Sequence, residues 1–234
     1  MTATSQSETG YFDPQTCNLD EFLALLDRST RAEDVPHAAD IQKNVPIYDM
    51  AKLRPMLEDS ASRRTLMAEW AQVLLSGPGA LALSGACTDL QAVDDATRLY
   101  EEIIAAEKAG SAGGGDHFAA SGANDRICAA GPDVFLRYFA STSISAVCEA
   151  WLGPNYQMTA QINLVHPGGA AQQAHRDYHL GFQSENISAS YPAHVHDLSP
   201  ALTLQGAVAH CDMPLESGPT KLLPFSQTYR AGYA

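Results

Sequence analysis

Two residues in the second half of the chain, His175 and Asp177, have the types and the spacing of metal ligands. Side chains two positions apart in an extended segment point to the same side, so an imidazole nitrogen and a carboxylate oxygen converge on one ion. Two nitrogens and one carboxylate on one face of an octahedron, with three positions open, form the site of non-haem Fe(II) oxygenases. Short patterns also arise by chance, and then both residues belong to a surface loop. The spacing alone leaves both interpretations open.

The elements that must position this pair are predicted to be helical in the first half of the chain and mostly extended in the second. Helical spacing of apolar residues, or a capping pattern such as Asn18 with Glu21, predicts helices over 19–28, 60–75, 90–104 (capped by Thr88), 133–139 and 143–152. β-type composition predicts strands over 80–84, 156–165, 201–210 and 221–223. A polar, Pro-containing stretch before residue 48 and a Gly-rich stretch at 110–115 are predicted to be irregular. This order favours an α+β fold, or a β-barrel core with a helical N-terminal layer.

An ordered set of motifs surrounds the candidate ligands. A strand with Gln161 and Asn163 precedes a Pro-Gly turn and the segment HRDYHLGFQ, and a later segment, AHCDMPLESGPTKLLPFSQ, carries Asp212, Gly218-Pro219, Pro224 and Ser226. The upstream segments SGPGALALSG and HFAASGANDRI complete the set. Over about residues 60–234 the chain resembles the phytanoyl-CoA dioxygenase family. The resemblance implies a double-stranded β-helix (jelly roll), Fe(II) held by His175 and Asp177, and 2-oxoglutarate as cosubstrate.

The resemblance also predicts how the chain is divided. Residues 1–59 are expected to be an N-terminal extension with a short helix, and 60–234 the oxygenase-like domain. Family members continue to a further strand with a second iron histidine and then an Arg for the cosubstrate, whereas this sequence stops at Ala234. The expectation is therefore a C-terminally truncated domain whose jelly roll lacks its last strands.

Polar residues on the predicted strands are candidates for the wall that binds 2-oxoglutarate: Gln161, Asn163, Thr203 and Gln205. Buried polar side chains need partners, which a dicarboxylate supplies, or else they hydrogen-bond to one another. Arg126 and Arg137 are further candidates for binding an anionic group, although salt bridges at the surface are more common for such residues.

The remaining histidines near the motif, His179, His194, His196 and His210, are expected to be exposed or locally hydrogen-bonded. The function that the resemblance implies is Fe(II)/2-oxoglutarate-dependent hydroxylation of a small organic molecule with O₂. Two alternatives stay open: a catalytically incomplete jelly-roll fragment, and a non-enzymatic, cupin-like metal-binding protein.

The composition limits the possible partners and compartments. With a net charge of -13 the chain lacks the clustered Lys and Arg that nucleic acid or an anionic membrane would require. The sequence contains no apolar run that could span a bilayer and no signal-peptide pattern. The five cysteines form no CxxC pair, which favours reduced thiols in a cytoplasmic protein. The oligomeric state is left open.

Overall fold

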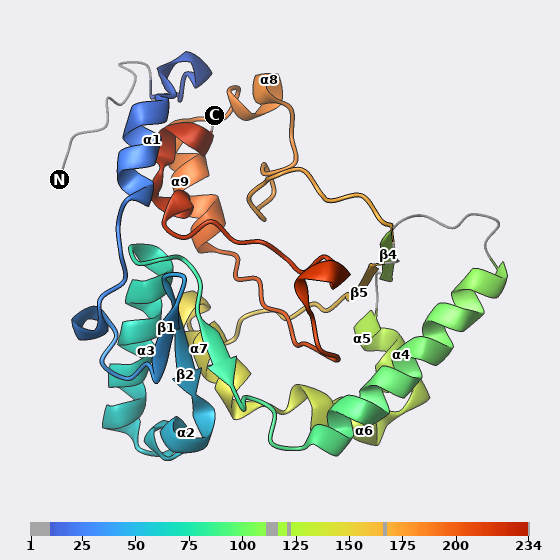
Figure 1. Cartoon of the computed structure of the whole chain (residues 1–234). Helices are drawn as coiled ribbons and strands as arrows, with labels where there is room; N and C mark the ends of the chain where they lie inside the picture. Colours follow the sequence, from blue (N-terminus) through green and yellow to red (C-terminus); the bar gives the residue numbers. More distant parts are fainter. Residues whose placement is uncertain (1–9, 111–116, 121–122, 166–167, 234) are drawn as a thin grey trace.

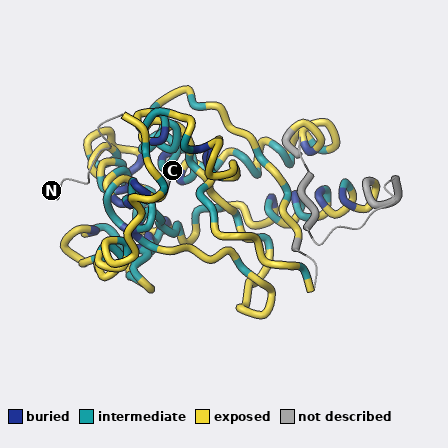
Figure 2. The backbone as a smooth tube through the Cα atoms, turned by 90° about the horizontal axis from the view of Figure 1, so that it is seen from above, coloured by how far each residue is buried: buried dark blue, intermediate teal, exposed yellow. Residues whose placement is uncertain are grey.

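The computed structural model describes residues 10–110, 117–120, 123–165 and 168–233. The fold is α+β, as predicted, with two groups of helices joined by long segments without regular structure (Figure 1). Each group has its own buried core, and the long segments between them are largely exposed (Figure 2).

The first core forms around a small mixed sheet. Its strands are β1 (Asp40–Gln42), β2 (Val45–Asp49) and β3 (Ala82–Ser84), in the order β1-β2-β3. The first pair is antiparallel and the second parallel. The helices α2 (Met50–Glu58), α3 (Ser60–Leu75) and α7 (Thr142–Leu152) pack with this sheet around the buried side chains of Tyr48, Met50, Leu57, Leu66, Trp70 and Ala146. Strands β2 and β3 are paired, so residues on both sides of position 60 share one sheet and one core.

Helix α3 shows why the helical predictions succeed. Its bounds coincide with the predicted 60–75, and its buried residues Leu66, Trp70 and Val73 recur at helical spacing. The Asp59 side chain accepts a hydrogen bond from the Ser62 amide at 2.8 Å and so satisfies one free donor of the first turn.

The second core lies among α4 (Leu90–Gly110), α5 (Ala123–Ala130) and α6 (Pro132–Phe139). Its fully packed members are Ala96, Tyr100 and Ile127. Strand β4 (His117–Ala120) pairs antiparallel with β5 (Ile162–Val165), so the predicted strand over 156–165 is confirmed only in its last four residues. The cap of α4 is Asp89, whose side chain accepts from the Ala92 amide at 3.0 Å, and not Thr88 as predicted.

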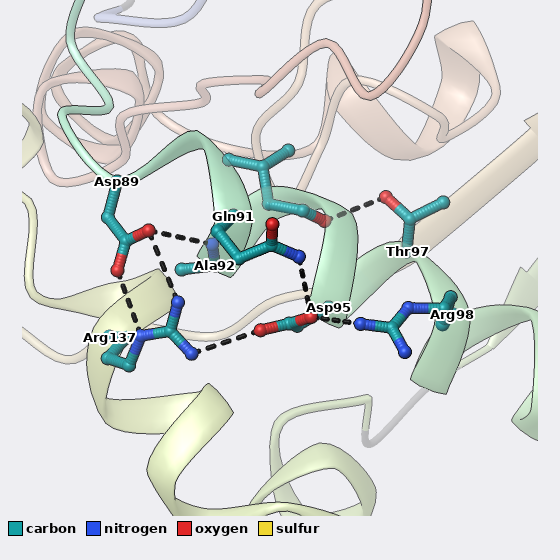
Figure 3. A network of polar contacts seen from close by, with 8 residues as sticks. Asp89, Gln91, Ala92, Asp95, Thr97, Arg98 and Arg137 are labelled. Atoms are coloured by element: carbon teal, nitrogen blue, oxygen red, sulfur yellow. Dashed lines mark hydrogen bonds and ion pairs between the residues drawn. The ribbon is translucent and has the colours of Figure 1, made fainter.

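A network of ion pairs joins α4 to α6 (Figure 3). The Arg137 guanidinium donates to both carboxylate oxygens of Asp89, at 2.8 and 3.2 Å, and to Asp95 at 3.0 Å. The hydrogen bond from Arg137 holds the pKa of the Asp89 carboxyl below its usual range. Arg137 is therefore engaged in surface ion pairs, the more common of the two roles considered from the sequence.

The C-terminal third contains short elements: α8 (Glu185–Ser188), α9 (Ala193–Ala201), and the 3₁₀ turns Leu215–Ser217, Ser226–Thr228 and Arg230–Tyr233. The last two turns lie beside α1 (Leu19–Leu26) and α9, where both ends of the described chain meet (Figure 1). Asn18 caps α1, as predicted, by accepting from the Glu21 amide at 3.1 Å.

Several strand predictions are wrong. Residues 203–209 and 218–223 have no regular structure, whereas strands were predicted over 201–210 and 221–223. Several of their apolar side chains are exposed, such as Leu202 at 78% and Leu222 at 64%, and among the described residues no strand pairs with either segment. The described residues do not confirm the jelly roll that the resemblance implies. Conversely, β1 and β2 lie in the stretch that was predicted to be irregular.

Other expectations from the sequence are also answered by the structure. All five cysteines are free. Among the described residues no helix is long and apolar enough to cross a membrane. The predicted Gly-rich loop lies mostly at 111–115, outside the described residues.

Candidate metal site

The side chains of His175 and Asp177 converge, with Nε2 and Oδ1 3.2 Å apart. The other ring nitrogen, Nδ1, lies 2.6 Å from the carbonyl oxygen of Gln173. Because a carbonyl only accepts, Nδ1 carries a proton, and Nε2 is the ring nitrogen that faces the Asp177 carboxylate. Two facing electron-pair donors repel each other unless a proton or a cation lies between them. The arrangement therefore suits either an imidazolium–carboxylate ion pair or a bound cation.

The chain around the pair is a bend followed by a tight turn. The Tyr178 amide donates to the Arg176 carbonyl at 3.0 Å, and the Gly181 amide donates to the Tyr178 carbonyl at 2.9 Å. A Cβ atom on Gly181 would lie 1.5 Å from the Arg176 carbonyl oxygen, so only glycine allows this approach. The turn brings the Phe182 ring against the His175 ring, with 4.3 Å between centroids. Phe182 is nevertheless 67% exposed and thus forms an open aromatic wall beside His175.

Tyr178 anchors the motif to helix α9. It is buried, and its hydroxyl donates to Nδ1 of His196 at 3.0 Å. His196 is fully buried and donates from Nε2 to the Ser188 carbonyl at 2.9 Å. Both ring nitrogens of this histidine are occupied, so it is a structural residue and not a ligand.

Arg176, between the two candidate ligands, ties the motif to the C-terminal segment. One of its terminal nitrogens, Nη2, donates to the carbonyl oxygens of Ser226 and Tyr229, at 2.8 and 3.0 Å. These bonds engage the Arg176 side chain with the C-terminal segment, while its neighbours His175 and Asp177 face each other.

The four residues predicted to contact 2-oxoglutarate are exposed: Gln161, Asn163, Thr203 and Gln205. Asn163 belongs to β5, where it stands opposite Ala119 of β4, and Thr203 follows the end of α9. The carbonyl of Thr203 accepts from the Trp151 indole at 2.9 Å, which places this residue beside α7. The four side chains therefore face solvent and do not line an enclosed barrel.

The other histidines fulfil local structural roles. His179 pairs with the Ser199 hydroxyl through Nδ1, and His194 is exposed on α9. Thr97 gives its proton to the Val93 carbonyl at 2.8 Å, so Nδ1 of His210 donates to Thr97. The Tyr138 hydroxyl donates to Nε2 of His210 at 2.7 Å, and burial lowers the pKa of this imidazole.

The described donor set fits a metal ion in part. Adjacent ligands of an octahedral ion with bonds of about 2.1 Å lie roughly 3 Å apart, close to the separation of the His175 nitrogen and the Asp177 oxygen. Within the described part of the chain, no group of three or more His, Cys, Asp or Glu residues is arranged to hold a metal. The pair thus supplies two ligands, and a complete site needs at least one more donor.

A histidine and a carboxylate that converge in this way are typical of mononuclear non-haem iron proteins. The model of the family "Phytanoyl-CoA dioxygenase (PhyH)" matches residues 66–234, and the chain belongs to this family. The match agrees with the range of the resemblance in the sequence. No curated protein and no solved structure matches the chain significantly.

Sequence reasoning missed three residues that shape the site: Arg176, Gly181 and Phe182. For Arg176 the H-x-D spacing was an available signal, because in an extended segment the middle residue points to the side opposite to its two neighbours. Gly181 and Phe182 depend on how the turn closes, which no periodic pattern encodes.

Proposed function

We propose that this protein is an Fe(II)/2-oxoglutarate-dependent dioxygenase that hydroxylates a small organic molecule. The observation that carries the proposal is the convergence of His175 Nε2 and Asp177 Oδ1, 3.2 Å apart, in a chain of the phytanoyl-CoA dioxygenase family. When bound, iron with 2-oxoglutarate supplies O₂ activation, and the overall reaction gives succinate, CO₂ and a hydroxylated substrate. Residues 60–234 are proposed to carry this site.

The residues of the chain would hold and orient the metal and offer an apolar surface beside it. The bond from His175 Nδ1 to the Gln173 carbonyl fixes the tautomer and the ring plane, as outer contacts of metal-binding histidines commonly do. Asp177 contributes negative charge, which offsets part of the charge of a divalent cation. The exposed ring of Phe182 offers an apolar surface beside the metal, suited to an apolar part of the substrate.

The contact of Gln161, Asn163, Thr203 and Gln205 with 2-oxoglutarate stays a prediction. Their amide and hydroxyl groups are exposed and so are available to a carboxylate, which accepts hydrogen bonds from such donors.

One observation favours a second candidate, a metal-binding protein without 2-oxoglutarate-dependent activity. The described residues present two converging donors and no cluster of three. Such a protein would bind a divalent metal weakly and would not be affected by 2-oxoglutarate.

The two candidates are separated by anaerobic titration with Fe(II) and 2-oxoglutarate, followed by visible absorption. The proposal expects a charge-transfer band in the unaltered protein, and its loss in His175→Ala and Asp177→Ala. His194→Ala removes an exposed histidine of α9 and is the control that should retain the band. Metal binding without the band would support the second candidate. A band that persists in both ligand variants would reject these ligands.

A further inference from the structure

The N-terminal segment around Asn18 packs against the C-terminal segment whose carbonyl oxygens bind the Arg176 side chain. The Asn18 amide donates to the Tyr229 hydroxyl at 2.7 Å, and the same hydroxyl donates to the Asn18 carbonyl at 3.1 Å. The Phe22 ring lies against the Tyr229 ring, with 5.2 Å between centroids. The Cys17 thiol donates to the Ala231 carbonyl at 3.3 Å. These contacts join residues more than two hundred positions apart.

Tyr229 stands between this N-terminal contact and the candidate metal ligands. It is 8% exposed, its hydroxyl is held by Asn18, and its carbonyl accepts from Arg176 at 3.0 Å. In the chain, Arg176 lies directly between His175 and Asp177. A continuous series of contacts therefore runs from Asn18 through Tyr229 and Arg176 to the ligand pair.

The segment of Tyr229 is fixed at other points too, so Arg176 meets a rigid surface. Phe225 is 2% exposed, its amide donates to the Pro78 carbonyl at 3.0 Å, and the Arg28 guanidinium lies 4.6 Å above its ring. The Gln227 side chain donates to the Gly77 carbonyl at 2.9 Å. A ligand group that is already held in place loses less conformational entropy when it binds, which increases affinity.

We propose that the N-terminal segment around Asn18 is a positioning element of the metal site, acting through Tyr229 and Arg176 on His175 and Asp177. The inference rests on the proposed metal site and extends it, because residues 17–28 lie outside the family match at 66–234. Tyr229 and Arg176 are positioning residues: the Arg176 side chain is engaged with the Ser226 and Tyr229 carbonyls, and each residue acts through the backbone that carries the ligands.

The test compares two tyrosine variants of the full chain with Mn(II) as the probe, a divalent ion that prefers the same oxygen and nitrogen donors. Tyr229→Phe removes the hydroxyl that binds Asn18 and keeps the ring against Phe22. Tyr100→Phe is the matched control, because Tyr100 is also 8% exposed but belongs to the second core. We expect the Kd for Mn(II) to rise about three- to tenfold in Tyr229→Phe and to stay unchanged in Tyr100→Phe.

A lower melting temperature of Tyr229→Phe with an unchanged Kd would mean that the contact only stabilises the fold, and would overturn the inference. If Tyr229→Phe does not fold, hydrogen exchange of the Asn18 amide in the unaltered protein decides instead. Coupling is reciprocal, so Mn(II) must slow this exchange, and must not do so in Asp177→Ala. Unchanged exchange would overturn the inference. If Mn(II) binds the unaltered protein and Asp177→Ala equally well, the proposed metal site itself fails, which is a separate result.

Discussion

Replacing Gly181 with alanine is expected to destabilise the turn that follows the ligand pair and to weaken metal binding. The added Cβ atom would lie 1.5 Å from the Arg176 carbonyl oxygen, whereas a carbon and an oxygen normally approach to about 3.3 Å. The turn must therefore open by about 2 Å. The obstacle is backbone and not a flexible side chain, so it has no alternative rotamer.

The loss in the free energy of unfolding can be estimated from the close contact that the methyl group creates and the hydrogen bond that the opened turn loses. Forcing a methyl group into a packed position costs about 1–3 kcal/mol, and the hydrogen bond from the Gly181 amide to the Tyr178 carbonyl contributes about 1 kcal/mol more. The free energy of unfolding should fall by about 2–4 kcal/mol. Phe182 would also leave the His175 ring, so the Kd for Mn(II) should rise.

Urea denaturation and Mn(II) titration measure the two effects. Gly206→Ala is the matched control, because a Cβ at Gly206 meets no atom within 4 Å. This control should be neutral or gain up to about 1 kcal/mol from a less flexible unfolded chain. Equal stability and equal Mn(II) affinity of the two alanine variants would refute the geometry described for the turn.

Two further predictions concern the cores. Leu66→Ala should lower the free energy of unfolding by about 2–5 kcal/mol in urea denaturation, because Leu66 is fully buried. Leu75→Ala on the same helix, where the side chain is 62% exposed, should cost little. Equal losses in the two variants would contradict the packing described for the first core. Burial lowers the pKa of His210 in the folded state, so its contribution to stability is complete above about pH 6.5 and declines as the pH falls towards the lowered pKa. The stability of the unaltered protein should therefore fall more between pH 7 and 5 than that of His210→Gln. Parallel pH profiles in chemical denaturation would contradict the partial burial of the His210 imidazole.

The helices were predictable because their signal is local. Over 60–75 the sequence alternates apolar and polar residues with the helical period, and one face packs on the core wherever that core lies. Strands β1 and β2 were missed because their burial follows from pairing across a turn in which Lys43 and Asn44 adopt positive φ angles, 49° and 70°. The segments 201–210 and 221–223 have β-type composition but find no partner strand among the described residues.

The candidate site was predictable in the same partial way. The spacing of His175 and Asp177 made their convergence one of two open interpretations, because the relation between residues two positions apart is local, and the surrounding motifs then favoured it. The support of the pair is not local, since Arg176 reaches carbonyls 50 and 53 positions later. Tyr229 and Asn18, 211 positions apart, could not be associated from one sequence.

The most direct test of the proposed oxygenase site is an anaerobic titration that adds Fe(II) and then 2-oxoglutarate, monitored by visible absorption. We expect a charge-transfer band that saturates at one iron per chain and is lost in Asp177→Ala. A folded, monodisperse sample that develops no band, or that develops the same band without the Asp177 carboxylate, would contradict the proposed site.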